Sequence, residues 1–143
     1  MDVELINNQL DRIEMILNDS LVSTGEANAI YGYRAMPSKL PFVISVSFLG
    51  GNPEPATSGG FGRYSDFAIV MEAHHDKTSQ TLRWSERQMN KVEGLITNLF
   101  QLDNFSADGL WMSTDFFRPS ARPPSPTNYP DARLGHLYLR VFH

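Results

Sequence analysis

The sequence predicts an α+β domain in which two helices cover one face of a mostly antiparallel sheet of about four strands, with a long hairpin loop projecting from the sheet. Two segments carry apolar residues at helical spacing, whereas the segments between and after them alternate apolar and polar residues as strands do. The order helix, strands, helix, strands is typical of α+β proteins. With 143 residues and no internal repeat, the chain has the size of a single domain, 1–143, built around one core.

The first helix is predicted from an apolar stripe near the N-terminus. Its residues recur at spacings of three and four with polar residues between them: Val3, Ile6, Leu10, Ile13 and Leu17. This spacing gives one apolar face on a helix of about four and a half turns. The segment 29–33 then has the composition of a short strand, and the two prolines of 34–41 forbid regular structure there.

A β-hairpin is predicted from two alternating runs, 42–48 and 64–72. One face of the pair is apolar and is expected to meet both helices: Phe42, Ile44, Val46, Phe67, Ile69 and Met71. The other face is only half apolar and is expected to meet a neighbouring molecule: Val43, Ser45, Ser47, Asp66, Ala68 and Val70. The loop between the runs, 50–62, is far longer than the two to five residues of an ordinary hairpin turn.

The second half of the chain predicts one more helix and two more strands. Ser85 to Gln88 has the pattern of a capping box, which would open a helix that ends at 103–108. The apolar face of this helix is expected to comprise Met89, Val92, Leu95, Ile96 and Leu99. Segments 110–117 and 136–142 follow as strands, the latter with Leu137, Leu139 and Val141 inward. Between them, 118–135 contains five prolines and is expected to run over the surface as a stiff extended segment.

The net charge of −4 is unevenly distributed. Residues 1–28 contain six acidic residues and one arginine, whereas 118–143 contain four arginines and one aspartate. Opposite charge at the two ends of a chain is expected where identical subunits pack head to tail, and the alternative is a first helix with a solvated acidic face. The acidic composition, with no basic stripe interleaved with aromatic residues, predicts no nucleic-acid recognition.

Composition also bears on the compartment. The chain has no cysteine, so neither a disulfide framework nor thiolate chemistry is available to it. Its longest uncharged apolar run, 40–51, is too short to span a membrane. The N-terminus begins with acidic residues and becomes amphipathic, the reverse of a secretory signal. We therefore expect that the chain does not associate with a membrane and that it assembles in a cytoplasm.

No group of residues predicts catalysis. His74, His75 and Asp76 are adjacent, so on a strand their side chains would point in opposite directions rather than to one metal ion. The glycines of 50–62 have no lysine among them and lead into a strand, unlike a phosphate-binding loop. Trp84 and Trp111 are more typical of core or interface anchors than of ligand-stacking residues. The expectation is therefore no enzyme, no metal and no cofactor.

The order of elements resembles that of the tail terminator proteins of long-tailed bacteriophages and related head–tail joining proteins of the neck. An amphipathic N-terminal helix is followed by IYGYRAMPSKLPFVISVSF, a long hairpin loop, a returning strand, a second helix and a C-terminal pair of strands. The resemblance covers nearly the whole chain and is carried by length and element order, since the family has no residue motif to match.

The resemblance implies a structural role in the virion. The chain would form a homo-oligomeric ring, typically a hexamer, that caps the tail tube and contacts the tail tube protein and a neck or connector protein. The hairpin loop would order against a neighbouring ring, which its glycines and prolines suit. The residues expected at the assembly interface are Gly50, Gly51, Pro53, Pro55, Gly59, Gly60, Phe61, Arg118, Arg122 and Arg133.

Two other classes of function remain open from the sequence. The chain could be a small ligand-binding or enzymatic α+β domain, with its pocket between sheet and helices and the loop 50–62 as a lid. It could also be an adaptor that binds one partner chain along a sheet edge. A pocket would require converging ionisable residues, whereas the predicted strands supply mainly Ser45, Ser47 and Asp66.

Overall fold

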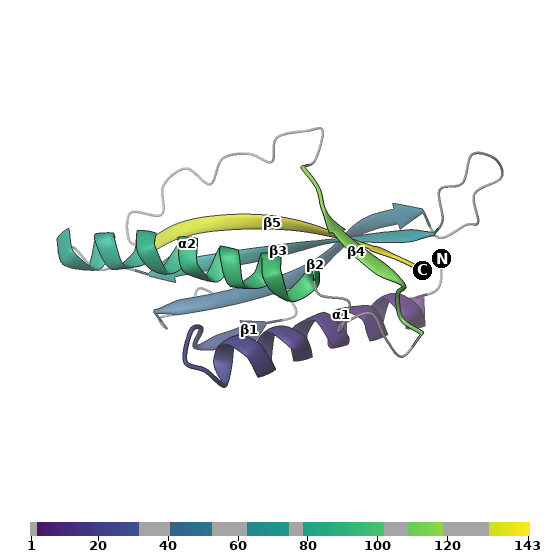
Figure 1. The fold of residues 1–143 in the computed structure, drawn as a ribbon, viewed down its shortest axis with the longest axis horizontal. Helices are drawn as coiled ribbons and strands as arrows, with labels where there is room; N and C mark the ends of the chain where they lie inside the picture. The colour runs from purple at the N-terminus through teal and green to yellow at the C-terminus, as the bar shows by residue number, and fades with distance from the viewer. Residues whose placement is uncertain (1–2, 32–40, 53–62, 75–78, 102–108, 119–131) are drawn as a thin grey trace.

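The computed structural model describes residues 3–31, 41–52, 63–74, 79–101, 109–118 and 132–143, and Figure 1 shows how they are arranged. The helical elements are α1 (Val3–Leu17), the π-helical turn η1 (Asn18–Val22) and α2 (Ser79–Gln101). The strands are β1 (Ala29–Tyr31), β2 (Phe42–Asn52), β3 (Tyr64–His74), β4 (Ser113–Phe116) and β5 (Ala132–Phe142).

The described strands form one five-stranded sheet in the order β1-β2-β3-β5-β4. Only β1 and β2 pair in parallel, and the other three pairs are antiparallel. Figure 1 shows both helices on the same side of this sheet, with α1 against β1 and β2 and α2 against β3, β5 and β4. The predicted α+β architecture is confirmed, with one strand more than expected because β1 joins the edge of the sheet.

The predicted hairpin is also confirmed. β2 and β3 pair antiparallel, with Ile44 opposite Met71 and Val46 opposite Ile69. All six residues predicted for the apolar face are fully buried and share one core with the apolar faces of α1 and α2. Strict alternation over two adjacent runs leaves only one register that buries every apolar side chain, which explains why this part of the fold is legible in the sequence.

The hairpin ladder extends further toward its loop than predicted. β2 continues to Asn52 beyond a β-bulge between Phe48 and Gly50, so Gly50 and Gly51 belong to the strand and not to the loop. Gly50 has φ +144°, which favours glycine, and a Cβ on Gly51 would collide with the backbone oxygen of Tyr64. The two glycines therefore let the strand pass the bulge and continue its pairing.

The predicted capping box is wrong. Helix α2 begins at Ser79, so Ser85 lies inside it, where its buried hydroxyl donates a hydrogen bond to the Leu82 carbonyl oxygen at 2.8 Å. Gln88 does not reach back to Ser85 and instead contacts Glu26, near the start of β1. A serine that bonds to the preceding turn of its own helix satisfies the same sequence pattern as a cap.

The C-terminal strands also differ from the prediction. β4 covers only Ser113–Phe116 of the predicted 110–117, because it pairs only with the last four residues of β5. β5 begins at Ala132, so 132–135 are not surface linker as expected, while 119–131 lie outside the described residues. The last proline of the segment is Pro130, which leaves the chain beyond it free to pair with β3. At Gly135 a Cβ would lie 2.6 Å from the Met89 sulfur, so a larger residue here would require that side chain of α2 to shift.

Helix α1 is rotated slightly from its predicted orientation. Ile6, Ile13 and Leu17 are buried as expected, but Val3 is 61% exposed and Leu10 only half-buried. The buried face instead includes Ile16 and Gln9, whose side-chain amide donates a 2.8 Å hydrogen bond to the carbonyl of Leu110. This hydrogen bond fixes the rotation of α1 against the segment that precedes β4, while the Oε1 atom of Gln9 is buried with no hydrogen-bond partner among the described residues.

Candidate assembly surface

Charge is distributed across the sheet from one edge to the other. Helix α1 packs over β1 and β2, at one side of the sheet, and presents Glu4 and Asp11 to solvent, while the exposed Asp19 lies in η1 directly after it. Strand β4 forms the other edge, and the exposed Arg118 lies two residues after its end. The acidic helix and the end of β4 that leads to Arg118 therefore lie on opposite sides of the domain, as the positions of α1 and β4 in Figure 1 show.

The described residues of the predicted interface do not form one patch. Gly51 is paired with Ser65, which is paired with Val141, so this glycine lies at the hairpin end of the sheet. Arg133 pairs with Ala73 at the other end, where its guanidinium lies 3.9 Å from Glu86 of α2. The remaining predicted residues lie outside the described residues: Pro53, Pro55, Gly59, Gly60, Phe61 and Arg122.

Arg118 and Arg133 share the β5 side of the molecule but are separated along it. The backbone N–H of Phe117 donates a hydrogen bond to the Tyr138 carbonyl, which places Arg118 beside the middle of β5. In this register Arg118 lies opposite Leu137, and Arg133 is four residues nearer the start of the strand, about 13 Å away at the usual rise of a β-strand. The two arginines can therefore contact different parts of one partner, but not one acidic group together.

A cleft opens beside Arg118, between α2 and the junction of β4 with β5. Its volume is about 390 Å³, and it is lined by Glu93, Phe116, Phe117, Arg118, His136, Leu137 and Tyr138. Burial lowers the pKa of His136 and raises the pKa of Tyr138, so both rings favour their neutral forms. The cleft thus combines an apolar lining with one basic and one acidic side chain at Arg118 and Glu93.

Sequence reasoning missed an ionic cluster on the face of the sheet that the helices do not cover. The guanidinium of Arg140 binds both carboxylate oxygens of Asp66, at 2.8 and 3.0 Å. It also lies over the rings of Tyr64 and Phe117, at 4.0 and 4.8 Å from their centroids. The hydrogen bonds that Arg140 donates to Asp66 are the main cause of its raised pKa. This cluster joins β3, β5 and the residue after β4, and its partners are too distant in sequence for a local pattern to reveal them.

The half-apolar face predicted to meet a neighbour is already partly covered within the chain. Val43 and Ala68 on this face are buried, and so is the carboxylate of Glu72. The Nε2 atom of His74 lies 2.8 Å from that carboxylate. Less of the helix-free face is therefore open to a partner than its sequence suggests.

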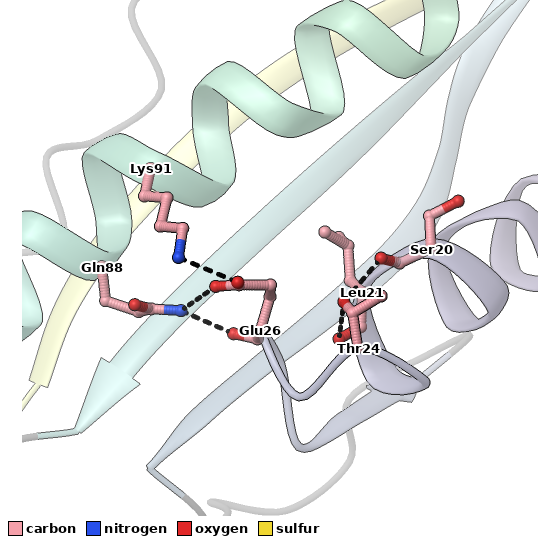
Figure 2. Close-up of polar contacts among 6 residues, drawn as sticks. All are labelled: Ser20, Leu21, Thr24, Glu26, Gln88 and Lys91. Carbon is pink, nitrogen blue, oxygen red and sulfur yellow. Dashed lines mark hydrogen bonds and ion pairs between the residues drawn. The ribbon is translucent and has the colours of Figure 1, made fainter.

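One N-terminal acidic residue is neutralised inside the domain, as Figure 2 shows. The Glu26 carboxylate lies 2.8 Å from Lys91 Nζ and accepts a 3.1 Å hydrogen bond from the Gln88 amide, which also donates to the Glu26 carbonyl. The hydrogen bond from Lys91 is the main cause of a lowered Glu26 pKa. Nearby, the Thr24 hydroxyl donates to the Ser20 carbonyl and closes the turn that follows η1. Glu26 therefore connects this turn to α2 and does not add to the acidic surface.

Within the described ranges, no three His, Asp or Glu side chains are grouped so that they could hold a metal ion, and His75 and Asp76 lie outside those ranges. Trp111 is part of the core, whereas Trp84 is exposed on α2. No described helix is long and apolar enough to cross a membrane.

A scan against models of protein families finds no match, and a search of curated proteins finds none either.

Proposed function

We propose that the chain is a structural protein of a phage virion, a tail terminator whose copies form a hexameric ring that caps the tail tube and joins it to the neck. The observation that carries this proposal is the position of opposite charges at opposite sides of one sheet. A molecule with an acidic helix on one side and exposed arginines on the other can join identical copies head to tail. Repetition of such a contact closes a ring when the rotation between neighbours divides a full turn.

The charges serve orientation more than affinity in this proposal. Exposed ion pairs contribute only about 0 to 1 kcal/mol each, so they choose between relative orientations of two copies without holding them tightly. Arg133 is already near Glu86 and Glu26 is already paired with Lys91, which leaves Arg118 and the outer acids of α1 for contacts between copies. The apolar lining of the cleft beside Arg118 offers the area that charges alone do not supply.

The hairpin supports the second part of the proposal, contact with a neighbouring ring or tube. β2 and β3 are eleven residues each, and in Figure 1 their hairpin end extends well past the C-terminal end of α2. The bulge at Gly50 increases the local twist of this end. A strand pair that continues beyond the end of α2 is a stiff support for a loop that reaches another subunit.

The direct test is tube capping. Polymerising tail tube protein should stop growing when the purified chain is added, and micrographs should show a ring at one tube end. Reversal of Arg118, Arg122 and Arg133 to glutamate should abolish capping while the subunit stays folded. The matched control reverses Arg83 and Arg87 on the outer face of α2 and should cap normally. Tubes of unchanged length with the wild-type chain would refute the proposal.

A second function is favoured by one observation, the cleft of about 390 Å³ that contains His136 and Tyr138. Cavities of this size hold small ligands in many proteins. If the chain is instead a ligand-binding or enzymatic domain, it should remain a monomer with tube protein present, and a small-molecule screen should raise its melting temperature through the cleft. Substitution of Tyr138 by alanine should then remove that shift, which the ring proposal does not require.

A further inference from the structure

The cleft has a lining that suits a side chain of mixed character. Phe116 and Leu137 provide apolar area, and Arg118 is exposed beside it. Glu93 projects from α2 on the other side of the cleft and is exposed as well. An occupant should therefore bring an apolar group for the lining and a negative charge for Arg118, with that charge held away from Glu93.

The outer face of α1 carries this combination. Met15 is a large apolar side chain that is 45% exposed, as Val3 is at 61%, although Ile6, Ile13, Ile16 and Leu17 of the same helix are buried. Asp11 lies one turn before it on the same face, and Glu14 is its immediate neighbour. Glu14 has a raised pKa, chiefly because of its partial burial and secondly because of Asp11. A positive charge that approaches these two carboxylates would therefore stabilise their charged forms.

We propose that the cleft is the receiving site for α1 of a second copy, with Met15 in the cleft and the carboxylate of Asp11 near Arg118. This inference rests on the proposed head-to-tail ring and names the contact that would build it. Within one chain, α1 covers β1 and β2 while the cleft lies beyond β5, so the chain cannot fill its own cleft with its own helix. A second copy can, and it leaves its own cleft open to a third.

The flexible, unbranched side chain of methionine fits cavities of irregular shape, and the cleft is ample for one such side chain. The charges on the two sides of the cleft also fix the direction of the helix. Asp11 is attracted by Arg118 and repelled by Glu93, so the reversed orientation of α1 would bring like charges together. The neutral forms of His136 and Tyr138 allow this apolar contact near neutral pH.

The test uses the absence of cysteine from the chain, which makes disulfide cross-linking specific. One preparation carries Met15→Cys and a second carries Glu93→Cys, so a disulfide between them can form only between copies. On oxidation, the mixture should give a covalent dimer. The control mixture pairs Met15→Cys with Arg87→Cys, which is also exposed on α2 but is not among the residues that line the cleft, and it should give none.

Charge exchange provides the second measurement. Asp11→Lys and Arg118→Glu should each weaken association about tenfold, and the double variant should recover most of that loss. Melting curves should show that these exposed substitutions leave the subunit folded. Intact rings without a 15–93 cross-link, or with the 15–87 cross-link instead, would overturn the cleft as the contact while leaving the ring proposal standing. A chain that never associates would overturn both.

Discussion

The two faces of the sheet are stabilised in different ways. On the helix side, Ile44, Ile69 and Leu139 are completely buried among apolar side chains. On the other side, neighbouring positions on β3 and β5 hold the Asp66–Arg140 pair, flanked by two aromatic rings. Apolar burial depends on area and is indifferent to the identity of each neighbour, whereas an ion pair depends on one partner in one register. The helix face therefore stabilises the fold, and the other face selects its strand alignment.

The two faces should differ most in the stability that is lost when a charge is placed on each of them at adjacent positions. Ile44→Asp would bury an unpaired carboxylate in the core and should cost several kcal/mol, enough to prevent folding. Ser45→Asp, one residue along and on the opposite face, should cost no more than about 1 kcal/mol. Circular dichroism and thermal melting report both. A soluble, cooperatively melting Ile44→Asp protein would contradict the assignment of faces.

A smaller effect is expected from the ionic cluster. Asp66→Asn or Arg140→Met should each cost about 1 to 3 kcal/mol, because each leaves a half-buried charged partner without its counter-ion. The double variant should cost less than the sum, and the difference measures the coupling of the pair. Chemical denaturation gives all four free energies. Additive losses would mean that the pair contributes nothing specific to the alignment of β3 with β5.

The smallest effect is expected at Glu26, near the edge of the helix layer. Its pKa is lowered in the folded chain, so its contribution to stability is present above the unfolded pKa and is lost as the pH falls through the folded value. Glu26→Gln should therefore reduce stability at neutral pH by less than Asp66→Asn does, and the deficit should vanish in acid. Melting temperatures measured between neutral and acidic pH check this, with Lys91→Met expected to give the same pH profile.

The sequence predicted most of what depends on local periodicity. The faces of β2 and β3, the inward residues of β5 and most of the buried face of α1 follow from spacing alone. It failed where a short pattern has two structural explanations, as at Ser85, and where pairing with a distant strand extends an element, as at Ala132. The cleft and the Asp66–Arg140 pair lie between residues far apart in the chain, so no window of sequence contains them.

The predicted interface was only partly recoverable for a related reason. The sequence showed that the chain ends in arginines and begins with acids, but not that Lys91 neutralises Glu26 or that Arg133 lies near Glu86. Of the described arginines in the predicted interface, Arg118 is therefore the one that is both exposed and next to a cleft. Net charge along a chain thus indicates which segments can attract one another, and the fold decides which of them remain available.

The measurement that tests head-to-tail ring formation most directly is the mass of the assembled wild-type chain across a range of concentrations, by analytical ultracentrifugation at low salt. A closed ring predicts one discrete assembly whose mass stops increasing with concentration at six subunits, and whose formation slows as salt screens the charges on its surface. A monomer at every concentration, or a series of masses that grows without limit, would contradict the account.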